Sequence, residues 1–129
     1  MKIGIDFDRV LFDTDRFNKY MKEETGLQHV DEDIYDEKGC YSPGKHAEAS
    51  GIDVEKVYGA MENLDGFVYD DVELLRELDE HTLVIVTRGE DRYQRAKIEA
   101  SGVKGLFENV YVVQEDSKDV DDVEFLVDD

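Results

Sequence analysis

Short apolar runs alternate with helical patterns along most of this chain. The runs lie at residues 2–7, 82–87, Asn109–Val113 and 123–127, and their apolar residues are nearly continuous, as in strands that are buried on both faces. Because helical patterns separate the runs, crossover connections must join successive strands, and such connections favour a parallel sheet. The alternation therefore predicts an α/β fold.

Three segments between these runs have apolar residues at helical spacing. Thr14–Thr25 is followed by Gly26, a residue that commonly ends helices. Residues 70–80 and Asp91–Ser101 show the same spacing, and Asp91 is expected to cap the latter helix. We expect these helices to cover the predicted sheet.

The interval 27–66 interrupts the alternation. It contains no strand pattern, a Ser-Pro-Gly turn at residues 42–44, and helical spacing at residues 54–63. A chain of 129 residues has the length of a single domain. We therefore predict one domain, residues 1–129, whose core comprises residues 1–26 and 67–129 and whose insertion is a small helical element.

Acidic residues dominate the composition: 34 Asp and Glu against 15 Lys and Arg give a formal net charge of −19. Such a charge repels nucleic acids and anionic membranes, and the 40% hydrophobic content still allows a core to form. With the single cysteine Cys40, no secretory leader and no apolar run that could span a bilayer, we expect a cytoplasmic protein that binds neither nucleic acid nor membrane. The acidity fits a high-salt habitat or merely a very soluble surface.

Polar side chains with related chemistry follow the predicted strands. They are Asp6, Asp8, Thr87, Arg88, Lys118, Asp128 and Asp129. Ligands of an open parallel sheet bind outside the carboxyl ends of its strands, so we expect these side chains to share one rim. Neighbouring carboxylates repel one another unless a cation lies among them, and their oxygens suit Mg²⁺.

The same rim suits phosphoryl transfer. Magnesium bound by few carboxylates accepts a phosphate oxygen, and a hydroxyl and an ammonium, here Thr87 and Lys118, can neutralise the phosphate further. An aspartate can itself be the nucleophile, with a second carboxylate as acid and base. The residues thus favour attack by Asp6 and proton transfer by Asp8.

Four motifs resemble those of the haloacid dehalogenase superfamily and occur in that family's order. Residues 3–14 (IGIDFDRVLFDT) are similar to motif I, residues 83–87 (LVIVT) to motif II, Lys118 to motif III, and residues 125–129 (FLVDD) to the diacid form of motif IV. The resemblance implies a Rossmann-like parallel sheet, for which we predict the strand order 4-1-2-3. It also implies that the insertion at residues 27–66 is a short type-1 cap.

The resemblance further implies a role for each matched residue. Asp6 would be the nucleophile, and Asp8 would be the acid and base and would bind metal through its backbone carbonyl. The phosphate ligands would be Thr87, Lys118 and, with less support, Arg88, and the Mg²⁺ ligands would be Asp6, Asp8, Asp128 and Asp129. Because dehalogenases of the superfamily lack the second aspartate of motif I, the resemblance implies phosphatase or phosphomutase chemistry. Of the two we expect a phosphatase that acts on a phosphorylated small molecule.

Some features leave alternatives open. Arg9 stands where the family usually has a small or acidic residue, and it either binds a substrate anion or pairs with a nearby acid. Lys97 is a rival for the role of Lys118, but its place within a helix predicts a position away from the strand ends. The short cap indicates either a large substrate or a homo-oligomer that completes the pocket, and its candidate contacts are Tyr35, Lys45 and His46.

Two other functions compete with the phosphatase. One is a non-catalytic module, or a truncated and inactive relative, that binds magnesium or phosphate without turnover. The other is a phosphoacceptor of receiver type, which would need its acceptor aspartate after the third strand, where this chain has Gln114. The second alternative is therefore disfavoured.

Overall fold

The computed structural model describes residues 1–29, 33–78, 80–114, 123 and 125–127. Within them one parallel sheet contains β1 (Lys2–Ile5), β2 (Thr82–Arg88), β3 (Asn109–Val113) and β4 (Phe125–Val127) in the order β3-β2-β1-β4. This is the predicted order read from the opposite edge. The α/β fold class is therefore confirmed.

The first strand is shorter than predicted because the chain turns sharply after Asp6. The Asp6 N–H still continues the ladder by donating to the Val127 carbonyl, at 2.9 Å. The next carbonyl, that of Phe7, instead accepts hydrogen bonds from the backbone N–H groups of Leu11 and Phe12. The loop that carries Asp8 thus begins directly at the carboxyl end of the strand.

Helices α1 (Thr14–Thr25) and α4 (Asp91–Ser101) have the predicted bounds. Gly26 ends α1 in the left-handed conformation, with φ of 83°. The predicted cap of α4 is wrong by one residue, since Glu90 holds the N-cap position without a side-chain hydrogen bond and Asp91 lies in the first turn.

The helix predicted at residues 70–80 is a 3₁₀ helix, η2 (Asp70–Leu78), instead of an α-helix. Its apolar residues Val72, Leu75 and Leu78 are spaced by three, which places them on one face when there are three residues per turn. A spacing of three satisfies both kinds of helix, so the sequence pattern could not distinguish them. Two shorter 3₁₀ helices are η1 (Asp65–Phe67) and η3 (Val103–Leu106).

The insertion contains two helices, α2 (Pro43–Ser50) and α3 (Val54–Gly59). Helix α2 was not predicted, because the Ser-Pro-Gly sequence at its start was interpreted as a turn. Ser42 instead caps the helix by accepting a hydrogen bond from the Lys45 N–H, and Pro43 occupies the first helical turn, where its missing N–H has no cost. Helix α3 ends earlier than expected.

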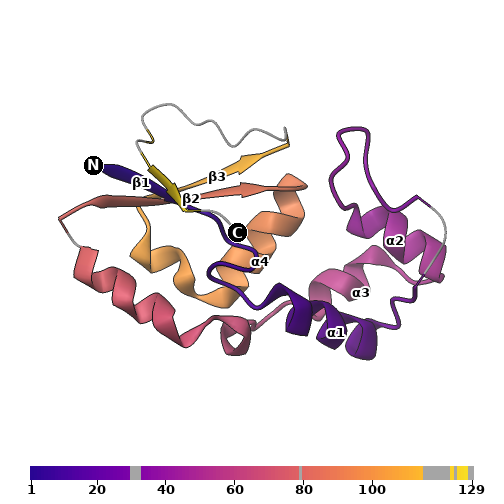
Figure 1. Ribbon diagram of the computed structural model, residues 1–129. Coiled ribbons are helices and arrows are strands. Elements are labelled where there is room, and N and C mark those ends of the chain that lie inside the picture. The colour runs from indigo at the N-terminus through magenta and orange to yellow at the C-terminus, as the bar shows by residue number, and fades with distance from the viewer. Residues whose placement is uncertain (30–32, 79, 115–122, 124, 128–129) are drawn as a thin grey trace.

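Figure 1 shows η2, η3 and α4 on the same side of the sheet, with α1, α2 and α3 grouped beside it. One apolar core links the two parts, and its aromatic members Phe7, Phe12 and Phe17 are fully buried. Phe7 stacks on Phe12 with ring centroids 4.7 Å apart, and Phe12 packs on Phe17 at 5.2 Å. These rings anchor the loop that follows β1.

None of the helices in the described part of the chain combines the length and the apolar character needed to cross a membrane.

Candidate active site

A tight loop presents Asp8 to helix α4. Phe7 before it is fully buried, and the Arg9 N–H after it donates to the Phe12 carbonyl at 2.9 Å. Arg9 has φ of 64°, a left-handed conformation that costs a residue with a Cβ about 1–2 kcal/mol. The loop therefore accepts local strain at the residue next to Asp8.

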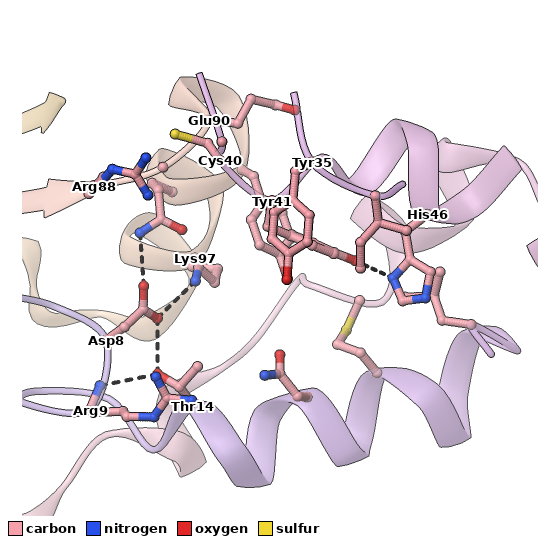
Figure 2. Close-up of a pocket in the computed structure, with 18 of the residues that line it drawn as sticks. Asp8, Arg9, Thr14, Tyr35, Cys40, Tyr41, His46, Arg88, Glu90 and Lys97 are labelled. Carbon is pink, nitrogen blue, oxygen red and sulfur yellow. Dashed lines mark hydrogen bonds and ion pairs between the residues drawn. The ribbon is translucent and has the colours of Figure 1, made fainter. Parts of the chain in front are cut away.

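Three side chains donate hydrogen bonds to the carboxylate of Asp8. Lys97 Nζ lies 2.8 Å from Oδ1, Thr14 Oγ1 lies 3.0 Å from the same oxygen, and Gln94 Nε2 lies 2.9 Å from Oδ2. Figure 2 shows these contacts converging on Asp8 from α1 and α4. The carboxylate is thus fixed in one orientation, with a quarter of its side chain still exposed (25%).

The same contacts hold Asp8 in its ionised form. Burial raises the pKa of this carboxyl, but the positive charge of Lys97 and the hydrogen bonds from Lys97, Gln94 and Thr14 together lower the pKa below its ordinary value. Asp8 is therefore ionised at neutral pH.

The expectation that Lys97 lies away from the strand ends is wrong. Its side chain is 4% exposed, and its ammonium lies 4.8 Å from the ring centroid of Tyr93 as well as beside Asp8. One signal in the sequence pointed to this position: Lys97 follows Tyr93 by four residues and Gln94 by three, so all three share one face of α4. A lysine on the apolar face of a helix needs a buried partner.

Gln94 is a functional candidate that sequence reasoning missed. Its amide nitrogen donates both to Asp8 and to the hydroxyl of Thr87, the latter at 2.7 Å. Thr87 itself is 1% exposed and lies behind Gln94. The structure therefore connects Thr87 to Asp8 through Gln94, and a phosphate could reach the Thr87 hydroxyl only after Gln94 moves.

The other predicted site residues have different surroundings. Asp6 is buried at the end of β1, and its Oδ1 accepts the Phe7 N–H at 2.8 Å. Arg88 lines the cavity described below and donates to the Lys38 carbonyl at 2.9 Å. Three further predicted residues lie outside the described part of the chain: Lys118, Asp128 and Asp129.

Arg9 forms an ion pair with Asp15 at 3.0 Å, with both side chains more than half exposed. This contact agrees with the pairing alternative for Arg9. Arg9 is also one of the residues that line the cavity.

A cavity of about 500 Å³ opens beside Asp8. Its walls come from the β1–α1 loop, from α1 and α4, and from the segment before α2 (Figure 2). Of the candidate contacts in the insertion, Tyr35 and His46 line it, whereas the Lys45 ammonium donates to the Tyr35 carbonyl at 2.7 Å. The volume lies within the range of small-molecule sites.

The donor set fits magnesium only in part. Asp6 offers a buried carboxylate and Asp8 a backbone carbonyl, both hard oxygen donors of the kind that Mg²⁺ prefers. The Asp8 side chain is instead neutralised by Lys97. Within the described residues no group of three or more His, Cys, Asp or Glu side chains is placed to hold a metal ion.

Solved structures of haloacid dehalogenase-like hydrolases share this architecture. A family hydrolase from Xanthomonas campestris matches 89% of this chain with a TM-score of 0.56 and 17% identity. YfnB from Bacillus subtilis, assigned to the HAD hydrolases and solved with magnesium, matches 86% with a TM-score of 0.55 and 13% identity. An L-2-haloacid dehalogenase from Xanthobacter autotrophicus, solved with covalently bound chloropropionic acid, matches 86% with a TM-score of 0.51 and 16% identity.

The chain spans 63%, 62% and 56% of the lengths of these three structures, respectively. No protein-family model and no curated protein matches the sequence. At such low identities the similarity concerns the arrangement of the backbone. On that evidence, together with the parallel sheet and the loop after β1, this chain has the fold of the haloacid dehalogenase-like hydrolases.

Proposed function

We propose that this chain is a magnesium-dependent phosphatase that hydrolyses a phosphoric monoester through an aspartyl-phosphate. The observation that carries the proposal is the Asp6-Phe7-Asp8 segment at the carboxyl end of β1, in a fold shared with hydrolases. Asp8 there borders the cavity and is held by Lys97.

In the first step of the proposed reaction, a carboxylate oxygen of Asp6 attacks phosphorus and the bond from phosphorus to the leaving oxygen breaks. Asp8 gives its proton to that oxygen. In the second step water attacks the phosphorus of the aspartyl-phosphate and transfers its proton to Asp8, which releases phosphate and regenerates Asp6. Each proton that leaves Asp8 is thus replaced in the same cycle.

The second step suits the ionised Asp8 of the ligand-free protein, because a carboxylate is the base that the water needs. The first step requires a protonated Asp8. An anionic phosphate in the cavity would compete for the Lys97 ammonium and so raise the pKa of Asp8 relative to the ligand-free protein. Substrate binding itself would then favour the acid form.

Lys97 is the phosphate-binding cation that the described contacts favour. Among the described residues its ammonium donates one hydrogen bond, to Asp8, so two N–H groups can serve an anion. The proposal keeps Thr87, Arg88 and Lys118 as further phosphate ligands. Magnesium, when bound, would neutralise charge on the phosphate oxygens, with Asp6, the Asp8 carbonyl, Asp128 and Asp129 as its ligands.

We also propose that residues 27–66 act as a small cap over a core formed by residues 1–26 and 67–129. Tyr35, Cys40 and His46 from this insertion line the same cavity as Asp8. A homo-oligomer that completes the pocket remains compatible with this short cap.

The test is hydrolysis of 4-nitrophenyl phosphate with and without Mg²⁺, at low and at molar salt. The wild-type chain should turn over only with Mg²⁺, and Asp6→Asn should lose at least about a thousandfold in rate. Glu62→Gln removes an exposed carboxylate that does not line the cavity and should retain the wild-type rate. Full activity of Asp6→Asn would refute the mechanism.

One observation favours a second candidate, a non-catalytic module that binds magnesium or phosphate. Asp8 accepts three hydrogen bonds and has a lowered pKa, which opposes its use as an acid. Such a module would show a higher melting temperature with Mg²⁺ or inorganic phosphate but no hydrolysis of any ester.

A further inference from the structure

Cationic residues outnumber acidic residues around the cavity beside Asp8, in contrast to the chain as a whole. Four cations and two carboxylates line it among the described residues, in a chain with a formal net charge of −19. They are Arg9, Lys22, Arg88 and Lys97 against Asp8 and Glu90. A cavity of this sign attracts an anionic ligand.

The cavity is larger than a phosphate group requires, and part of its wall is apolar. At about 500 Å³ the cavity can also hold an organic group, and its lining includes the apolar side chains of Met21, Leu27 and Ile34. A ligand that fills it must combine an anionic part with an apolar part.

Two tyrosines define the shape of the apolar part. Tyr35 and Tyr41 are paired by an antiparallel bridge, which places their side chains on the same side of the backbone, and both line the cavity. In the view of Figure 2 their rings lie between the Asp8 network and His46. Tyr35 remains 51% exposed, so its ring has surface that a ligand can cover.

The contacts of Tyr41 direct its hydroxyl away from a ligand. His46 Nε2 lies 2.8 Å from the Gln28 carbonyl, which can only accept, so this nitrogen carries the proton. In the neutral imidazole, His46 Nδ1 then accepts from the Tyr41 hydroxyl at 2.6 Å. Burial, with a smaller contribution from Tyr58, raises the pKa of Tyr41, so the phenol stays neutral and does not repel an anion.

The segment that carries Tyr35 and Tyr41 is held in place by contacts of the ligand-free protein. The Lys45 ammonium donates to the Tyr35 carbonyl at 2.7 Å, the Ser42 N–H donates to the Ile34 carbonyl at 2.7 Å, and the Tyr41 ring packs against Tyr93 with centroids 5.4 Å apart. A fixed aromatic surface binds a flat ring with little loss of conformational entropy.

We infer that the substrate is a phosphate monoester that contains a planar ring, either an aryl phosphate or a nucleotide, whose ring lies on Tyr35 and Tyr41 while its phosphate faces Lys97 and Arg88. This inference rests on the proposed phosphatase for the fate of the phosphate. The recognition of the ring depends on binding alone.

The test uses phosphonates, whose carbon–phosphorus bond an aspartyl nucleophile does not hydrolyse. Isothermal titration in the presence of Mg²⁺ compares benzylphosphonate, cyclohexylmethylphosphonate and methylphosphonate. Benzylphosphonate should bind at least about tenfold more tightly than methylphosphonate, the gain expected from stacking one ring, and clearly more tightly than the non-planar cyclohexyl compound.

Tyr35→Leu should remove most of this preference for benzylphosphonate and leave the affinity for methylphosphonate unchanged, and Tyr35→Phe should restore the preference. Tyr69→Leu is the matched control, since Tyr69 is also an exposed tyrosine, at 38%, and does not line the cavity. Tyr69→Leu should bind all three compounds like the wild type.

Equal affinities for the three phosphonates, no binding of any, or an unchanged preference in Tyr35→Leu would each overturn the inference. Ring-dependent binding by a chain that hydrolyses no phosphate ester would support the ring site and refute the phosphatase. Hydrolysis that needs Asp6, combined with equal affinities for the phosphonates, would support the phosphatase and refute the ring site.

Discussion

Removal of the buried ammonium of Lys97 should be one of the most destabilising single changes near the site. The side chain is 4% exposed, and Asp8, its partner at 2.8 Å, is 25% exposed. Lys97→Met keeps the aliphatic volume but leaves a carboxylate with only neutral donors, Gln94 and Thr14. Breaking a buried pair from one side costs about 3 kcal/mol, and we expect a loss of that size in the free energy of unfolding.

A double-mutant cycle separates the ion pair from the packing. Asp8→Asn alone leaves the ammonium among aromatic rings with no counterion, and should cost about 2 kcal/mol. Lys97→Met combined with Asp8→Asn removes both charges, so the double variant should be more stable than the two single losses predict by about 2 kcal/mol. Urea unfolding at pH 7, followed by far-UV circular dichroism, measures all four proteins.

The control is Lys104→Met, which changes the net charge of the chain by the same amount. Lys104 pairs with Glu99 at 3.4 Å, with side chains 64% and 72% exposed, so its removal should change stability by less than about 0.5 kcal/mol. If Lys97→Met were as mild as this control, or if the cycle gave a coupling below about 0.5 kcal/mol, the structural role assigned to the Asp8–Lys97 pair would be refuted.

Three further predictions concern the same region. Gly89→Ala would place its Cβ 2.7 Å from Gln94 Cγ and displace that side chain, so hydrolysis of 4-nitrophenyl phosphate should fall about tenfold or more, measured on protein shown by circular dichroism to be folded. Arg9 has φ of 64°, so Arg9→Gly should stay within about 0.5 kcal/mol of the wild type in urea unfolding, whereas Arg9→Val should lose about 1–2 kcal/mol. Because the pKa of Asp8 is lowered in the folded protein, its contribution to stability is present above the pKa of the unfolded chain and is lost as pH falls through the folded-state pKa; acid titration of the unfolding free energy should therefore be less steep for Asp8→Asn.

The elements with unambiguous local signals were predictable from the sequence. Each of the four strands overlaps one of the predicted apolar runs, and the order of the sheet was confirmed. Gly26 and Gly102 both adopt the left-handed conformation that ends a helix, which is why α1 and α4 end where expected. Helix α2 was missed because a serine followed by a proline starts turns and helices alike, and the choice between them depends on whether the following residues pack.

The candidate site was less predictable because its contacts join distant parts of the chain. Asp8 and Lys97 are 89 residues apart in sequence, and Gln94 reaches both Asp8 and Thr87. Lys97 lies within a helix in the sequence pattern, so local reasoning placed it away from the strand ends. Its helical spacing from Tyr93 indicates instead a place on the apolar face of the helix. Only the folded structure decides between these two positions for Lys97.

The net charge of the chain and the Asp8–Lys97 ion pair should respond differently to added salt. A formal net charge of −19 makes the compact state repel itself, and molar salt, with a Debye length of about 3 Å, removes much of that repulsion. The Asp8–Lys97 pair lies mostly inside the protein at 2.8 Å, and salt screens such a pair much less than it screens exposed charges. Added salt should therefore raise the melting temperature of the chain while the coupling between Asp8 and Lys97 stays constant. A coupling that disappeared in molar salt would mean that water and ions reach the pair, and the electrostatic argument for an ionised Asp8 would then fail.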